Sequence, residues 1–261
     1  MASSLDGLKT VHSFLGDVAG LTTVLADLLP LLDRMEGGWL RQWAVLDSAL
    51  VPAAAGRWDE ALETTDRALR LTHETGYDAY AGYFRAQRAW LARLSGDLDT
   101  ALEDGRLAVA HASPTAHPWW YAAAAGVQAT TLLELGRPED AASLAAAGLA
   151  VLSPQSGAAY RLRCLAPLAA ATGEGLEETD RLLRGVRAPA NRGWLLGADV
   201  YESVAAAWIA AGEPERATDT VAPLLDATGG GSWDAVHARL RQSSSPSSAA
   251  ALAAPSDGTG T

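Results

Sequence analysis

The sequence has 261 residues, of which 49% are hydrophobic, enough for one large core or a continuous solenoid. Its formal net charge of −11 argues against a surface that binds nucleic-acid phosphates or anionic lipids. One cysteine, Cys164, excludes an intramolecular disulfide and a metal site built from several cysteines.

The N-terminal region favours a cytoplasmic protein. The opening MASSLDGLKT lacks the charged and apolar regions of a signal peptide. The most apolar early stretch, Leu21 to Leu32, is interrupted by Asp27 and is too short to cross a bilayer. Abundant Ala, Gly, Leu and Arg beside a single lysine, Lys9, are typical of a GC-rich genome, so we expect an actinobacterial source.

A short segment recurs along the chain, and each copy begins with a glycine. The copies begin at Gly16, Gly56, Gly96, Gly136, Gly173 and Gly212, which are 40, 40, 40, 37 and 39 residues apart. Glycine adopts the left-handed conformation that ends one helix and turns the chain into the next. The spacing therefore predicts a helix-turn-helix unit that repeats along the chain.

The residues after each glycine are those of a helix start. Pro138 and Pro214 fall where a first-turn proline costs no hydrogen bond. Acidic residues that complement the helix dipole follow the glycines: Asp59, Glu60, Asp99, Glu139, Asp140 and Glu215. One equivalent position then carries a small side chain that lets helices approach closely: Ala61, Ala101, Ala141 and Ala217.

The segments before the glycines read as the partner helices. They start near Gly38, Asp78, His117, Gly157 and Gly193. We therefore predict an all-α fold, a right-handed α-solenoid of about six TPR-like antiparallel helix pairs over residues 1–241. Residues 242–261, rich in Ser, Ala, Gly and Pro, form a predicted disordered tail.

The apolar run LADLLPLL, with Pro30 inside it, leaves two interpretations open. It is either a kinked cap helix or a sticky interface, and the second would allow a homodimer or an assembly platform.

The repeat resembles the tetratricopeptide family, and AGRWDEALETTDRAL carries its pattern of small residues and turn glycine. The copies are longer than the usual unit. They look most like the C-terminal helical repeats of actinobacterial LuxR-type and ATPase-containing regulators, as in RCLAPLAAATGEG. This resemblance implies architecture rather than activity. The given chain carries neither an ATPase before the repeats nor a helix-turn-helix after them, so DNA-binding activation is not implied.

The chemical motifs favour no cofactor and no metal. There is no GxxxxGK[ST], and Lys9 lies outside any glycine-rich loop, which disfavours nucleotide binding and a Schiff base. His111 and His117 flank a turn without further good ligands. Cys164 has Arg161 and Arg163 nearby, which would activate a thiol, but its place on an apolar stripe favours a buried inert one.

The first helix of each TPR pair lines the concave surface, so the resemblance implies which side chains face a groove. These positions form an aromatic N-terminal wall, a middle of small residues such as Ala123, Gly126 and Thr130, and a charged far end. The candidate ligand-binding residues are Trp39, Trp43, Tyr80, Tyr83, Trp90, Trp119, Trp120, Tyr160, Arg163, Asp199 and Glu202. The competing interpretation is that the aromatic residues only pack helices together.

These observations favour a binding scaffold or ligand sensor, regulatory or accessory to secondary metabolism. Its partner would be a peptide, a protein or an apolar small molecule with a polar end. The alternative is a cofactor-independent enzyme of cyclase or isomerase type, with Asp199, Glu202, Arg163 or Tyr83 as acid, base or oxyanion partner. Closure of the superhelix around a pocket, with a carboxylate of raised pKa, would favour the enzyme.

Overall fold

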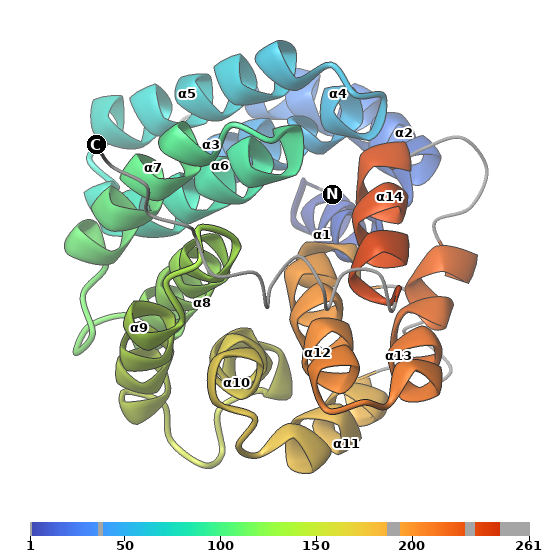
Figure 1. Ribbon diagram of the computed structural model, residues 1–261. Helices are drawn as coiled ribbons and strands as arrows, with labels where there is room; N and C mark the ends of the chain where they lie inside the picture. Colours follow the sequence, from blue (N-terminus) through green and yellow to red (C-terminus); the bar gives the residue numbers. More distant parts are fainter. Residues whose placement is uncertain (1, 36–38, 187–193, 228–232, 246–261) are drawn as a thin grey trace, which may run out of the picture.

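The computed structural model describes residues 2–35, 39–186, 194–227 and 233–245, and all regular structure within these ranges is helical (Figure 1). The helices are α1 (Ala2–Leu15), α2 (Val18–Leu32), α3 (Trp39–Ser48), α4 (Leu50–Ala54), α5 (Trp58–Glu74), α6 (Ala81–Ser95), α7 (Leu98–His111), α8 (Pro118–Glu134), α9 (Pro138–Ala150), α10 (Ala158–Thr172), α11 (Leu176–Val186), α12 (Ala198–Ala210), α13 (Pro214–Ala227) and α14 (Asp234–Ser243), with 3-10 turns η1 (Asp78–Tyr80) and η2 (Leu195–Gly197). The helices pack in sequential pairs, so the all-α prediction is confirmed.

The turn glycines have the backbone conformation that the repeat predicts. Gly16, Gly56, Gly96, Gly136, Gly173 and Gly212 all have φ between 69° and 89°. A side chain is strained in this left-handed region, which explains why the same residue type recurs at every turn.

The predicted helix starts are also present. Pro138 and Pro214 are the first residues of α9 and α13. The small residue of each repeat is fully buried, with no exposed surface at Ala61, Ala101, Ala141 and Ala217. A larger side chain at these positions would push the paired helices apart.

The helices depart from the repeat at two places. The helix expected to reach the turn at Gly56 is divided into α3 and α4, because Pro52 has no N–H to donate to the carbonyl of Ser48. The helix expected from Gly193 starts only at Ala198, after η2. Gly193 itself lies outside the described residues, as do Gly38 and the predicted tail from residue 246 on. Two residues of that tail, Gln242 and Ser243, belong to α14.

The helix pairs are arranged around a ring, and the two ends of the described chain meet (Figure 1). Helix α1 contacts η2, and α14 contacts both α6 and α12. The backbone N–H of Trp233 donates to the carbonyl of Ala54 at 2.9 Å, and its indole N–H donates to the carbonyl of Gly16 at 3.0 Å. The inner face is therefore enclosed over much of its length and does not form an open groove.

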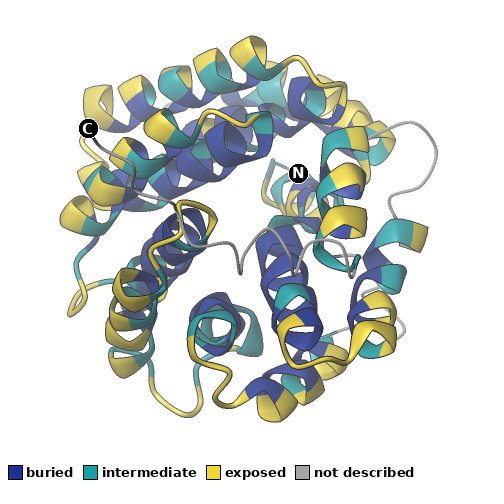
Figure 2. Ribbon diagram, viewed as in Figure 1, coloured by how far each residue is buried: buried dark blue, intermediate teal, exposed yellow. Residues whose placement is uncertain are grey.

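Burial follows this arrangement. Figure 2 shows that α12 is mostly buried, whereas α9 and α13 carry exposed residues on their outer sides. In α2, three of the five leucines of the LADLLPLL run pack inward, with Leu25, Leu28 and Leu32 at most 5% exposed. The other two, Leu29 and Leu31, are half-buried. None of the helices in the described ranges is both long enough and apolar enough to cross a membrane.

Candidate ligand-binding site

A cavity of about 410 Å³ lies where α3 and the N-terminal ends of α6 and α10 face α1 and η2. Its volume falls within the range of small-molecule pockets. It is lined by Asp6, Lys9, Thr10, Ser13, Phe14, Trp39, Trp43, Asp47, Tyr83, Ala159, Tyr160, Arg163, Trp194 and Leu196. We call this cavity the inner pocket.

The inner pocket brings together five of the eleven predicted site residues: Trp39, Trp43, Tyr83, Tyr160 and Arg163. Trp39 and Trp43 are four residues apart on α3, and Tyr160 and Arg163 are three apart on α10. Side chains at these spacings lie on one face of a helix. Three helices that are far apart in the chain thus present one face each to the same space.

An aromatic cluster supports the wall formed by Trp43. The ring centroid of Trp43 lies 5.4 Å from those of Tyr80 and Tyr83 and 4.8 Å from that of Phe84. Trp120 packs against Tyr80 at 4.8 Å. The predicted residues Tyr80 and Trp120 therefore pack against Trp43 but do not line the inner pocket themselves.

The predicted residue Trp119 is 47% exposed at the start of α8 and does not line the inner pocket. The other predicted tryptophan, Trp90, is only 2% exposed and belongs to the main core.

The predicted charged end of the groove is also enclosed. Asp199 and Glu202 are 1% and 7% exposed and do not line the inner pocket. The guanidinium of Arg93 donates to Glu202 at 2.8 Å and to Glu134 at 3.0 Å. Burial lowers the pKa of Arg93, but the nearby carboxylates of Glu202, Glu134 and Asp199 outweigh burial and raise it, so the guanidinium stays charged.

Arg239 of α14 completes this charged network, which we call the central ion cluster. It bonds to Glu134, lies 3.4 Å from Glu202, and donates to the backbone carbonyl of Arg93 at 3.4 Å. The central ion cluster joins α6, α8, α12 and α14 across the middle of the ring.

The predicted middle of the groove, formed by small residues, is helix packing instead. Ala123 and Thr130 of α8 are 1% and 5% exposed. A Cβ atom at Gly126 would lie 2.3 Å from the backbone oxygen of Arg163, so α8 and α10 touch here. This expectation was wrong because small residues allow helices to approach until no groove remains between them.

Residues of α1 and one carboxylate of α3 were not among the predicted site residues. The ammonium of Lys9 lies 2.9 Å from Asp6 and 2.8 Å from Asp47. Asp47 follows Trp43 by four residues, so the face of α3 could have indicated it. Lys9 could not be found this way, because α1 precedes the first clear repeat.

Burial and charge act on this ion pair in opposite directions. Burial lowers the pKa of Lys9, but the charges of Asp47 and Asp6 outweigh it and raise the pKa above its usual value. Burial raises the pKa of Asp47, and the nearby Lys9 only partly offsets this rise. A protonated lysine is a poor nucleophile, so the structure offers no reactive amine here.

Arg163 forms part of the floor of the inner pocket and is held by the protein. Its guanidinium donates to the backbone carbonyl of Leu196, lies 3.6 Å from Asp199, and sits 5.8 Å from the ring centroid of Trp194. Nearby, burial raises the pKa of Tyr83 to about 12, so its hydroxyl is neutral at physiological pH.

The single cysteine is buried, as one of the two interpretations of its sequence position predicts. Cys164 has no exposed surface, and its thiol donates to the carbonyl of Ala122 at 3.3 Å. Burial raises its pKa to about 12, which makes the thiol unreactive at neutral pH. Within the described ranges, no group of three His, Cys, Asp or Glu side chains is placed to hold a metal ion.

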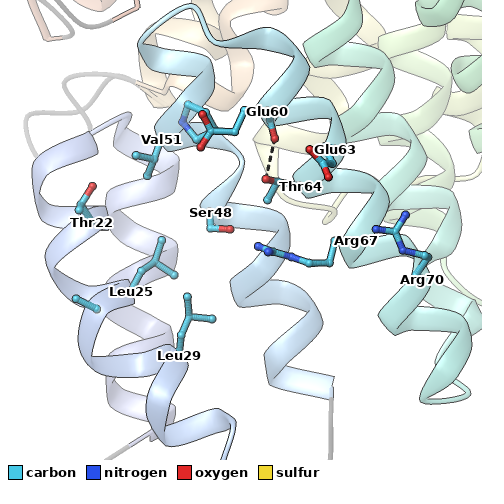
Figure 3. Close-up of a pocket in the computed structure, with 12 residues that line it drawn as sticks. Thr22, Leu25, Leu29, Ser48, Val51, Glu60, Glu63, Thr64, Arg67 and Arg70 are labelled. Carbon is cyan, nitrogen blue, oxygen red and sulfur yellow. Dashed lines mark hydrogen bonds between the residues drawn. The ribbon is translucent and has the colours of Figure 1, made fainter.

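A second groove of about 560 Å³ lies on the outside, between α2, the α3–α4 segment and α5 (Figure 3). Its charged side chains come from α5, and Glu63 and Arg67 are both exposed. None of the eleven predicted site residues lines it, nor does any aromatic side chain. Variants in this outer groove can therefore serve as controls for variants in the inner pocket.

The fold defines an all-helical repeat protein with TPR-like helix pairs. It is similar to a solved Rap protein complexed with competence and sporulation factor, with a TM-score of 0.55, 9% sequence identity and 85% of this chain covered. The match spans 60% of the length of that Rap chain. No protein-family model and no curated protein matches the sequence, so the resemblance to LuxR-type regulators gains no support.

Proposed function

We propose that this protein is a non-enzymatic ligand-binding scaffold of regulatory type, whose ligand is a peptide segment or a small molecule held in the inner pocket. The observation that supports it best is the convergence of α1, α3, α6 and α10 on one cavity lined by six aromatic residues. Cavities that combine aromatic walls with a few polar groups are typical ligand sites. The Rap structure, solved with a bound factor, supports a binding role for this architecture.

Native mass spectrometry of gently purified protein tests this proposal. Trp39→Ala and Tyr160→Ala change the pocket at residues that are not fully buried, so we expect both variants to fold. The wild-type protein should retain an additional mass, and both variants should lose it. Arg67→Ala, in the outer groove of Figure 3, is the matched control and should retain it.

Two outcomes would contradict the proposal. If both pocket variants retain the additional mass and Arg67→Ala loses it, the ligand binds in the outer groove and not in the inner pocket. A bare chain in every sample, together with no binding of peptide or metabolite mixtures added afterwards, would leave the inner pocket without a ligand-binding role.

A cofactor-independent enzyme is the second candidate, because the ring closes around a pocket and Asp47 on its wall has a raised pKa. Asp47 would then be the general base. The retained mass distinguishes the two candidates. An enzyme would convert an added excess of that compound and Asp47→Asn would stop the conversion, whereas a scaffold would return the compound unchanged.

A further inference from the structure

The charges around the inner pocket are unevenly accessible. The side chain of Lys9 is 2% exposed, whereas those of its partners Asp6 and Asp47 are 23% and 17% exposed. More of the carboxylate surface than of the lysine surface is therefore accessible, and the ammonium is already paired with both carboxylates.

The other cation of the inner pocket is also committed to the protein. The side chain of Arg163 is 9% exposed and is occupied by the Leu196 carbonyl and by Asp199, itself 1% exposed. The described residues that line the pocket thus carry two cations, Lys9 and Arg163, and two carboxylates, Asp6 and Asp47, and both cations are already paired. An anionic ligand would have to break one of these pairs and leave a carboxylate uncompensated, which disfavours its binding.

The walls of the inner pocket favour the opposite charge. Trp39, Trp43, Tyr83 and Tyr160 all line it, and the negative face of an aromatic ring attracts cations. Because the hydroxyl of Tyr83 keeps its proton, its ring contributes to the attraction of a cation without adding a negative charge of its own. Carboxylates and aromatic faces around one cavity are the groups that recognise an organic ammonium ion.

We infer that the inner pocket selects a ligand with a protonated amine on an aromatic or apolar body. This inference rests on the proposed function and adds the charge of the ligand to it. The amine belongs to a free small molecule or to the N-terminus of a peptide, and the same carboxylates would hold either.

Calorimetric titration of the full chain with three indole probes tests the charge. Tryptamine, tryptophol and indole-3-acetate share one aromatic body and differ in charge. Tryptamine should bind about tenfold more tightly than tryptophol, the usual order of a partly desolvated cation–π and carboxylate contact, and indole-3-acetate should bind most weakly.

Three variants locate the effect. Asp47→Asn and Asp6→Asn should each weaken tryptamine binding several-fold, and the more exposed Asp6 provides the test if loss of Asp47 loosens α1. Glu63→Gln removes the same charge from the outer groove and should change nothing. A matching loss in Glu63→Gln would mean that tryptamine only responds to the net charge of −11, which overturns the inference.

The remaining outcomes separate this inference from the proposed function. If indole-3-acetate binds best and the pocket variants Trp39→Ala and Tyr160→Ala weaken it, the site exists but its charge preference is the reverse. If none of the three probes binds, this inference fails, and the mass retained in native mass spectrometry still decides the proposed function. Trp-Ala-Ala amide with a free or acetylated N-terminus identifies the source, because a peptide-binding pocket should hold the free form more tightly than tryptamine.

Discussion

At the scale of single residues, Lys9 is the cation that fastens α1 to the rest of the ring. It reaches Asp47 of α3 at 2.8 Å while its side chain is 2% exposed. Lys9→Met would leave Asp6 and Asp47 facing each other without a counter-charge. We expect the free energy of unfolding to fall by about 2–3 kcal/mol, somewhat less than for a fully buried pair, because both carboxylates keep some solvent.

Urea unfolding followed by circular dichroism measures this loss. The double variant Lys9→Met with Asp47→Asn is the control, since it removes one of the two unpaired charges. It should recover part of the loss, and together with the single variant Asp47→Asn it gives the coupling energy of the pair. Equal stability of wild-type protein and Lys9→Met would mean that the ion pair does not fasten α1.

Cys164 gives the protein a defined sensitivity to alkali. Its pKa is raised to about 12 in the fold, whereas an unfolded cysteine titrates near about 8.5. Above pH ~8.5 the unfolded chain loses a proton that the folded protein keeps, so stability falls as the pH rises. Between pH ~8.5 and ~10, before unfolded tyrosine and lysine titrate, the slope should approach about 1 kcal/mol per pH unit.

The slope of unfolding free energy against pH in Cys164→Ala checks this assignment, whatever its absolute stability. The slope in that window should become nearly flat. A thiol reagent should label the wild-type cysteine only after unfolding, and rapid labelling of the folded protein would contradict the burial of Cys164.

At the scale of the helices, the turns could be predicted and the faces only in part. A turn depends on local chemistry, so Gly56, Gly96 and their counterparts could be recognised without any knowledge of the fold. The face of α3 was harder to predict. Trp43 lines the inner pocket, and so does Asp47, which was not among the predicted residues, whereas the adjacent Leu46 is 2% exposed and packs in the core. A shift of one residue turns a helix by about 100°, which exchanges a wall residue for a core residue.

The contact between α8 and α10 provides a prediction at this scale. A Cβ atom at Gly126 would lie 2.3 Å from a backbone oxygen of α10, and backbone cannot move aside as a flexible side chain can. Gly126→Ala should therefore reduce stability by about 1–3 kcal/mol.

Gly185→Ala in α11 is the matched control for this contact. A Cβ atom there would meet no other atom within 4 Å. Since alanine favours a helix over glycine, this variant should gain about 0.5–1 kcal/mol. The midpoints of thermal or urea unfolding of the two variants should shift in opposite directions from that of the wild-type protein. An unchanged midpoint in Gly126→Ala would mean that α8 and α10 do not touch at this point.

At the scale of the whole molecule, closure of the ring explains what the sequence analysis could not anticipate. The contacts that close it join Gly16 to Trp233 and Arg93 to Glu202, which are 217 and 109 residues apart. No local pattern marks such pairs. Asp199 and Glu202 were expected at an open end for this reason, since in an open solenoid each repeat contacts only its neighbours.

The contacts of Trp233 with Gly16 and Ala54 close the ring, and we call them the seam. Substitution of Trp233 tests how much the seam stabilises the protein. Trp233 is 2% exposed, and its indole N–H is bonded to Gly16 at 3.0 Å. Trp233→Phe keeps most of the apolar contact and should lose about 1 kcal/mol for the hydrogen bond. Trp233→Ala also removes the buried ring, which should cost about 3–5 kcal/mol.

Hydrogen exchange distinguishes a closed ring from a row of independent repeats. In a closed ring, Trp233→Ala should speed amide exchange in α14 and also in α1 and α2, because Gly16 between them loses its partner. Helix α9 should keep its protection, since it carries no residue of the seam or of the central ion cluster. In an open array the faster exchange would stop at α12–α14, because only neighbouring repeats are coupled. Faster exchange at both ends of the described chain would thus show that the contact between Trp233 and Gly16 holds the ring closed around the inner pocket.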